Sequence, residues 1–292
     1  MQWQAHRLDL GRRTSVMGIV NVTPDSFSDG GRFFDPAAAV AHGLRLAAEG
    51  ADILDVGGES TRPYADPISP AEEAARVVPV IEALAARVAV PISIDTMKAE
   101  VAQKALAAGA AMINDVSALR HDPRMAAVAA AAGVPVILMH MLGTPKTMQR
   151  APRYDDLHGE VAAFLAEAMD RAAAAGIPRS RMILDPGIGF GKTVAHNLSL
   201  VRHTRSLAAL EAPLLVGPSR KAFIRSLLAE DGAEPPAPDD PRVALGTQAV
   251  ATAAILAGAH ILRVHDVAAT RASARIADAL LEAKGPENPP PL

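Results

Sequence analysis

Four polar side chains that close short apolar runs have the clearest chemical potential in this chain. Asn21, Asp95, Asn114 and Asp185 stand at or next to the ends of MGIVN, ISID, MIND and MILD. Amides and carboxylates can pair with the N–H and carbonyl groups along the edge of a flat ligand. Any one of them alone is better interpreted as the N-cap of the following helix. The four together favour a shared, hydrogen-bonding floor for a ligand.

A second group of residues suits an anion. VGPSRKAFI places Ser219 and Lys221 beside a predicted helix start, and RVHDV places Arg263 and His265 two residues apart. Cationic side chains, a hydroxyl and a helix N-terminus together suit a phosphate or pyrophosphate. A lone His265 would be a hydrogen-bonded structural histidine, so its closeness to Arg263 favours the anion site.

Two polar, glycine-containing loops could cover such a site. NVTPDSFSDGGRFFD carries three of the six Phe residues of the chain, at 27, 33 and 34. This pattern predicts a lid that closes over substrate, against the alternative of an ordinary surface turn. GGESTRP carries Arg62, which suits bidentate anion binding but equally suits a surface pair with Glu59 or Asp66.

The elements that must position these residues are eight short apolar runs, which alternate with Ala-rich helical segments. The runs are too short for helices and lack polar alternation, which is typical of parallel strands buried on both faces. Eight strand–helix units predict a single α/β domain, a (β/α)8 TIM barrel with its active site at the C-terminal ends of the strands. An open doubly wound sheet is the competing architecture. The expected strands are Val16–Asn21, Ile53–Val56, Ile92–Asp95, Met112–Asp115, Val136–Met139, Met182–Asp185, Leu214–Gly217 and Ile261–Val264.

Boundary signals divide the chain into three parts. We expect residues 1–14 to cap the bottom of the barrel, residues 15–284 to form it, and residues 285–292 to be a disordered tail. The pairs Asp35-Pro36, Asp122-Pro123 and Asp240-Pro241 predict helix starts, each with an N-cap followed by Pro at N1.

Composition excludes several classes of function. The net charge of −3 gives no reason to expect nucleic acid as a partner, and the absence of cysteine excludes thiolate catalysis. No run reaches membrane-spanning length and the N-terminus lacks a signal-like apolar core, so we expect a cytoplasmic protein with no membrane partner. No cluster has the spacing of an all-protein metal site. A single Asn21 near bound phosphates would suit Mg²⁺, which keeps several waters.

Eight motifs together resemble the dihydropteroate synthase family. They are GIVNVTPDSFSDGG, DVGGESTRP, SIDT, INDV, LMHMLGTPKTMQ, LDPGIGFGK, GPSRK and RVHDV, in that order from Met17 to Val267. The resemblance implies a pterin-binding TIM barrel that acts as a homodimer. It also implies a reaction, in which 6-hydroxymethyl-7,8-dihydropterin pyrophosphate condenses with 4-aminobenzoate, with Mg²⁺ assisting, to give dihydropteroate and pyrophosphate.

The same resemblance implies a role for each matching residue. Asp95, Asn114, Met139, Asp185, Gly217 and Lys221 would bind the pterin. Thr61, Arg62, Ser219, Arg263 and His265 would bind the pyrophosphate, with Asn21 on the metal. Phe27, Asp29, Pro63 and Phe190 would shape the 4-aminobenzoate site. One departure is Ala222, where relatives often carry a side chain that borders the aminobenzoate carboxylate.

Two alternative functions remain open from sequence. A pterin-dependent methyltransferase would share the pterin pocket but would have no use for the Arg263/His265 anion site or the aromatic first loop. A non-catalytic paralogue should have lost residues of that loop, of the metal site or of the anion site, and this chain retains them.

Overall fold

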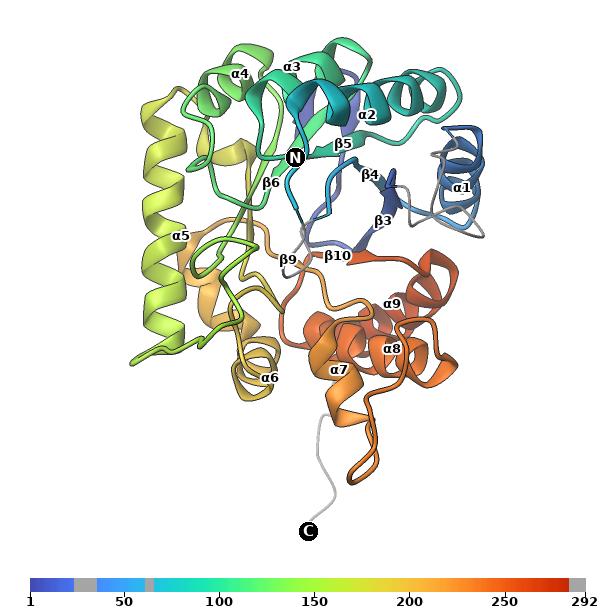
Figure 1. The fold of residues 1–292 in the computed structure, drawn as a ribbon, viewed down its shortest axis with the longest axis vertical. Coiled ribbons are helices and arrows are strands. Elements are labelled where there is room, and N and C mark those ends of the chain that lie inside the picture. Colours follow the sequence, from blue (N-terminus) through green and yellow to red (C-terminus); the bar gives the residue numbers. More distant parts are fainter. Residues whose placement is uncertain (24–35, 61–65, 284–292) are drawn as a thin grey trace.

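The computed structural model describes residues 1–23, 36–60 and 66–283. Eight parallel strands form a barrel, and helices surround it (Figure 1). Its strand order is β8-β7-β6-β5-β4-β3-β10-β9, and a bridge between Leu184 and Leu214 closes the ring between β8 and β9. The predicted TIM barrel is therefore confirmed. Its strands are β3 (Ser15–Asn21), β4 (Ile53–Gly57), β5 (Ile92–Asp95), β6 (Met112–Asp115), β7 (Val136–Met139), β8 (Met182–Asp185), β9 (Leu215–Val216) and β10 (Ile261–Val264).

Each strand leads into a helix that covers the outside of the barrel. Two α-helices, α7 and α8, follow β9, and the Pro-rich segment at 229–239 separates them. The helices are α1 (Pro36–Ala48), α2 (Pro70–Ala85), α3 (Ala99–Ala107), α4 (Met125–Ala132), α5 (Leu157–Ala174), α6 (Val194–Arg202), α7 (Ala222–Leu227), α8 (Pro241–Leu256) and α9 (Val267–Glu282). Within the described ranges, none of these helices is both long and apolar enough to cross a bilayer.

Of the Asp-Pro pairs, Asp240-Pro241 predicts its helix start correctly and Asp122-Pro123 does not. Asp240 caps α8 and accepts a hydrogen bond from the backbone N–H of Arg242 (2.8 Å). The prediction at Asp122-Pro123 is wrong, because α4 begins at Met125. Asp122 accepts a hydrogen bond from the backbone N–H of Arg124 (3.0 Å) and another from the backbone N–H of Ala99 (3.0 Å), so its carboxylate also serves the start of the neighbouring helix α3.

The side chains inside the barrel lie in layers, because every second residue of a strand faces the interior. The lower layer is one apolar cluster of Met17, Ile53, Met112, Ile137, Ile183, Leu215 and Ile261. Side chains alternate between the two faces of a strand, so the residues two positions later face the same interior nearer the C-terminal mouth. That upper layer is largely polar and contains Ile19, Asp55, Asn114, Met139, Asp185, Gly217 and Arg263.

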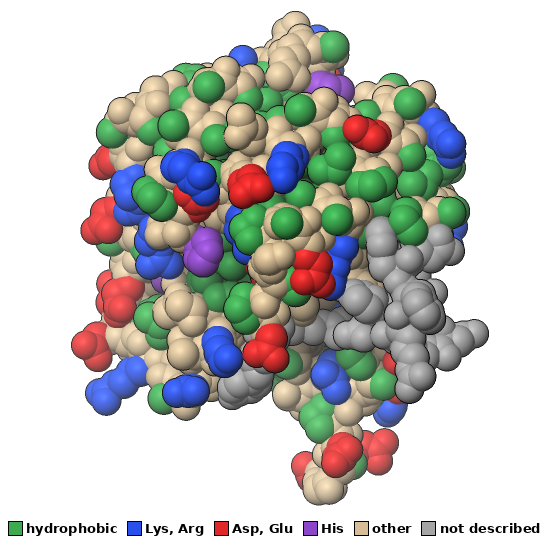
Figure 2. Space-filling model, turned by 45° about the horizontal axis from the view of Figure 1, so that its top comes forward, with side chains coloured by type: hydrophobic (Ala, Val, Ile, Leu, Met, Phe, Trp, Pro, Cys, Tyr) green, Lys and Arg blue, Asp and Glu red, His purple; other side chains and the backbone are tan. Residues whose placement is uncertain are grey.

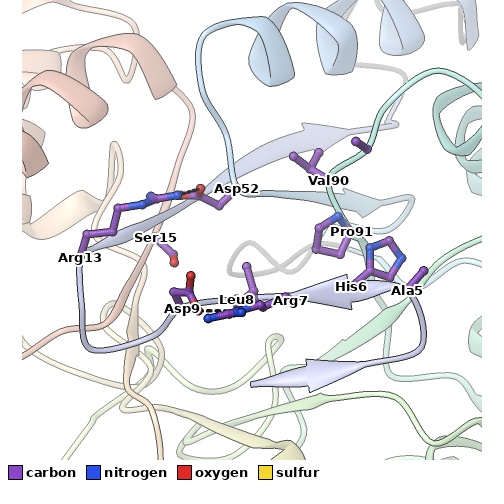
Figure 3. A pocket seen from close by; sticks show the side chains of 11 residues that line it. Ala5, His6, Arg7, Leu8, Asp9, Arg13, Ser15, Asp52, Val90 and Pro91 are labelled. Carbon is purple, nitrogen blue, oxygen red and sulfur yellow. Dashed lines mark hydrogen bonds and ion pairs between the residues drawn. The ribbon is translucent and has the colours of Figure 1, made fainter.

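A hairpin of β1 (Gln2–Trp3) and β2 (His6–Arg7) lies across the opposite end of the barrel. Trp3 is buried against the apolar lower layer, and its indole N–H donates to the carbonyl of Ala111 (2.8 Å). A cavity of about 240 Å³ lies beside the hairpin (Figure 3). Two ion pairs in its wall, Arg7–Asp9 (2.7 Å) and Arg13–Asp52 (2.6 Å), neutralise its charges internally.

Candidate active site

A charged network occupies the mouth of the barrel. Arg263 on β10 donates from Nε to Asp55 Oδ2 (2.6 Å) and from Nη2 to Asp95 Oδ2 (2.6 Å). Asn114 on β6 donates from Nδ2 to the same Asp55 oxygen (3.0 Å). Three residues predicted from sequence, Asp95, Asn114 and Arg263, therefore come together from three strands.

Asp55, at the centre of this network, is the functional residue that the sequence analysis missed. It stands inside the apolar run ILDV rather than at its end, and its side chain is fully buried. A signal was available in the strand period. Asp55 lies two residues before Gly57, and Gly57 pairs in register with Asp95, so both carboxylates face the interior.

Burial changes the protonation of the acids and bases at the mouth. It raises the pKa of Asp95 to about 7, although the charge of Arg263 acts in the opposite direction. Burial also raises the pKa of the Asp185 carboxyl, opposed chiefly by the charge of Lys221. The pKa of Lys221 falls to about 8 because its ammonium is buried, with Asp185 opposing the fall. Asp185 and Lys221 therefore stabilise each other's charged forms.

Asp185 ends β8 and begins the glycine loop that follows it. Its Oδ1 accepts a hydrogen bond from the backbone N–H of Gly187 (2.6 Å). Gly187, Gly189 and Gly191 all have positive φ, at 70°, 84° and 63°. At Gly187 a Cβ would clash with the carbonyl oxygen of His140, so glycine is needed there for space as well as for conformation.

Four successive carbonyls of this loop each accept a hydrogen bond from a side chain. Lys221 Nζ donates to Ile188, Gln149 Nε2 to Gly189 (2.6 Å), Lys192 Nζ to Phe190 (2.9 Å) and the Tyr154 hydroxyl to Gly191 (2.8 Å). The Phe190 ring packs against a cluster of methionines and Val116, and Lys221 Nζ lies 4.6 Å from its centroid. The loop after β7 thus fixes the loop after β8, and with it the position of Phe190.

Removing one of these supports tests their effect. Burial raises the pKa of Tyr154 to about 12, so its hydroxyl remains a donor at neutral pH. We expect Tyr154→Phe to lower the free energy of unfolding by about 1 kcal/mol, the usual net value of one hydrogen bond. If Phe190 borders a 4-aminobenzoate site, as the family resemblance implies, the KM for 4-aminobenzoate should also rise severalfold, because Phe190 loses its fixed position. The KM for the pterin substrate serves as the control, and an equal rise in both would contradict the assignment.

The predicted anion residues also meet at the mouth. Ser219 Oγ and His265 Nδ1 are 3.0 Å apart, and the backbone N–H of His265 donates to the same hydroxyl (3.3 Å). Asn21 is half-buried at the end of β3. Two predicted pterin residues complete the wall. Met139 is buried in the methionine cluster, and Gly217 would place a Cβ 3.9 Å from Lys221 Nζ.

The remaining predicted site residues lie outside the described part of the chain. These are Phe27, Asp29, Thr61, Arg62 and Pro63. The base of the second loop is nevertheless visible at Glu59, which accepts hydrogen bonds from Lys98 Nζ (2.8 Å) and from the backbone N–H of Ile68 (2.9 Å). Lys98 also pairs with the fully buried Glu73 (2.5 Å).

The comparisons with known proteins agree with this geometry. The family model described as pterin binding enzyme matches residues 17–265. A dihydropteroate synthase of Synechocystis sp. is 47% identical over 272 residues, covering 93% of this chain and 92% of its own length. A Yersinia pestis dihydropteroate synthase, solved in complex with a sulfonamide drug, has a TM-score of 0.86 at 46% identity and covers 95% of this chain and 97% of its own. A Xanthomonas albilineans dihydropteroate synthase, solved with 4-aminobenzoic acid, has a TM-score of 0.84 at 51% identity and covers 93% of this chain and 94% of its own.

Proposed function

The chain belongs to the pterin-binding enzymes and, within them, to the dihydropteroate synthase family of folate biosynthesis, and we propose how the residues at its barrel mouth divide the reaction. The enzyme is a transferase that joins 6-hydroxymethyl-7,8-dihydropterin pyrophosphate to 4-aminobenzoate. The observation that carries the division of roles is the convergence of Asp95, Asn114 and Asp185 with Arg263 and Lys221 in one buried mouth.

The pterin binds against the upper layer of the barrel. Asp185 accepts two hydrogen bonds from adjacent N–H groups of the ring, a paired contact that is strong in a dry pocket. Asn114 and Asp95 meet the neighbouring ring edge, and Lys221 donates to the oxygen side of the ring. Met139 and Phe190 supply apolar contact beside this polar floor.

The reaction forms a C–N bond and breaks a C–O bond. The amine of 4-aminobenzoate attacks the methylene carbon of the pterin substrate, and the pyrophosphate leaves with the electron pair of the broken bond. The amine then loses a proton, so no protein nucleophile is required. His265 and Ser219 stabilise the charge of the departing pyrophosphate, together with Thr61 and Arg62. Arg263 contributes through Nη1, because its Nε and Nη2 already bind Asp55 and Asp95.

The second substrate binds nearer the solvent. We assign Phe27, Asp29, Pro63 and Phe190 to the walls of the 4-aminobenzoate site. The Yersinia pestis relative was solved with a sulfonamide drug, and sulfonamides resemble 4-aminobenzoate, which supports a 4-aminobenzoate site of this kind.

Mg²⁺ is the metal that this site would accept. Among the described residues no group of three acidic, His or Cys side chains could hold a metal ion, so a metal here must rely on substrate oxygens and water. Asn21 would supply one amide oxygen, and the ion would neutralise charge on the pyrophosphate.

We expect EDTA to stop turnover and Asn21→Ala to raise the Mg²⁺ concentration needed for half-maximal rate. Binding of 6-hydroxymethyl pterin, measured without Mg²⁺, should be the same in the variant and in the wild type. If the variant needs no more Mg²⁺ than the wild type, Asn21 is not a ligand of the metal.

A homodimer through α7, α8 and α9 would cover the apolar side chains exposed there. Leu245 on α8 is 72% exposed and Ile276 on α9 is 65% exposed, and the two helices pack side by side (Figure 1). We expect Leu245→Glu to shift sedimentation from dimer to monomer. The same change at Leu198 on α6, itself 42% exposed, should leave the dimer intact. A wild-type protein that sediments only as a monomer would contradict the proposal.

The surface supports small molecules rather than nucleic acid as partners. On the face shown in Figure 2, acidic and basic side chains of the described residues are interspersed. A cytoplasmic location is our expectation for an enzyme with these substrates.

Turnover of purified protein tests the proposed function directly. Dihydropterin pyrophosphate and 4-aminobenzoate should give stoichiometric dihydropteroate and pyrophosphate. Pterin binding without pyrophosphate release would instead favour a non-catalytic paralogue, and methyl transfer would favour the methyltransferase alternative.

A further inference from the structure

Asp55 contacts two side chains of the predicted site, Arg263 and Asn114. One oxygen, Oδ2, accepts hydrogen bonds from both Arg263 Nε and Asn114 Nδ2. The other oxygen, Oδ1, is buried with no hydrogen-bond partner among the described residues. The carboxylate therefore directs its bonding entirely toward Arg263 and Asn114.

The chemistry of a carboxylate decides which way the Asn114 amide turns. An ionised carboxylate only accepts hydrogen bonds, whereas an amide has one donating and one accepting end. Arg263 Nε lies 2.6 Å from Asp55 Oδ2 and can only donate, so this oxygen is an acceptor. The NH₂ end of Asn114 must then face Asp55, which leaves its carbonyl oxygen for other partners.

We propose that Asp55 is a positioning residue that fixes Asn114 as a hydrogen-bond acceptor toward the pterin ring. The proposal rests on the pterin site assigned above. An amide free to turn would present NH₂ to the N–H edge of the pterin in part of the population, and a donor facing a donor loses the contact. Asp55 thus contributes to specificity for a ligand edge that donates, without touching the ligand.

The Asp55→Leu variant removes the shared acceptor with little change in volume. Both hydrogen bonds go to the one oxygen Oδ2, so its loss leaves neither end of the Asn114 amide preferred. We expect the affinity for 6-hydroxymethyl-7,8-dihydropterin, measured by calorimetry, to fall by at least about tenfold, the effect of a lost buried hydrogen bond.

Asp55→Asn should retain binding. Because Oδ1 of Asp55 has no hydrogen-bond partner among the described residues, the amide introduced at position 55 can place its carbonyl where Oδ2 stands and accept from both Arg263 and Asn114. We expect the affinity to stay within about threefold of wild type, whereas Asn114→Asp should bind weakly because two carboxylates then face each other.

Ser93 provides the matched control. It pairs in register with Asp55, is fully buried, and has a hydroxyl with no hydrogen-bond partner among the described residues. Ser93→Ala therefore changes the same layer without breaking a hydrogen bond, and its pterin affinity should stay within about twofold.

The outcomes separate this proposal from the proposed function. A folded Asp55→Leu variant that binds the pterin as tightly as wild type would overturn the role of Asp55. If Asp55→Leu does not fold, as judged by thermal unfolding, the test is Asp55→Asn, and a folded Asp55→Asn variant that binds at least about tenfold more weakly would overturn it in the same way. A wild-type protein that does not bind the pterin would instead refute the pterin site itself.

Discussion

Asp185→Asn should remove most of the affinity for the pterin while leaving the fold intact. The backbone N–H of Gly187 already donates to one oxygen of Asp185, so asparagine must keep its carbonyl there. Its NH₂ then faces ring N–H groups from which the second carboxylate oxygen of Asp185 would accept hydrogen bonds, so donors face donors. We expect a loss of about 2 kcal/mol, roughly a 30-fold weaker binding, from an unsatisfied buried contact. Calorimetry with 6-hydroxymethyl-7,8-dihydropterin measures it.

Asp115→Asn is the matched control for this variant. Asp115 is also a fully buried aspartate at a strand end, but its oxygens accept hydrogen bonds from Ser117 and from the backbone N–H of Leu119. Its replacement should lower stability and leave pterin affinity unchanged. If Asp185→Asn binds the pterin as tightly as wild type, Asp185 is not the pterin anchor.

Arg263→Ala should have the largest effect on stability. It leaves Asp55 and Asp95 buried beside each other without their shared cation. Removing one partner of a buried ion pair typically costs about 3 kcal/mol or more. Urea unfolding measures the loss. Arg242→Ala, which breaks an exposed pair with Asp240, should leave stability nearly unchanged.

The loss should depend on pH in a defined direction. Burial already raises the pKa of Asp95 to about 7, and loss of the arginine removes the charge that opposes this rise. The folded variant then holds protons that the unfolded chain releases above about pH 4, so its stability falls as the pH rises. Arg263→Ala should therefore be less destabilising at pH 5.5 than at pH 8. A loss that does not vary with pH would mean that Asp55 and Asp95 are not the groups left uncompensated.

The sequence predicted the architecture because the strand signal is local. Short apolar runs between glycine-ended helices suffice to count eight strands, and polar residues at run ends locate the mouth. Asp95, Asn114 and Asp185 could be found in this way. Their contacts could not, since the choice of Arg263 as a partner for Asp95 depends on the curvature of the barrel, which brings β10 within reach of β5 across β3 and β4.

Two failures have the same physical origin. Asp55 was missed because a carboxylate inside an apolar run gives no end-of-strand signal, and only the register with β5 shows where it faces. Asp122 was assigned to its own helix although its carboxylate serves Ala99 on the neighbouring one. Local sequence predicts local hydrogen bonds, such as the one from Arg124 to Asp122, but not those that Asp55 and Asp122 form across elements.

The closure of the barrel sets where the native protein should open first. A single bridge joins β8 to β9, whereas β3 and β4 pair through five residues. That seam lies directly below Asp185 and Lys221, and the bond from Lys221 to the carbonyl of Ile188 crosses it at the mouth. Hydrogen exchange through local opening is therefore expected to concentrate at β9. A pterin bound by Asp185 on one side and Lys221 on the other would connect the two sides of this seam. Bound substrate should therefore reduce local opening at β9 and make the barrel unfold more cooperatively.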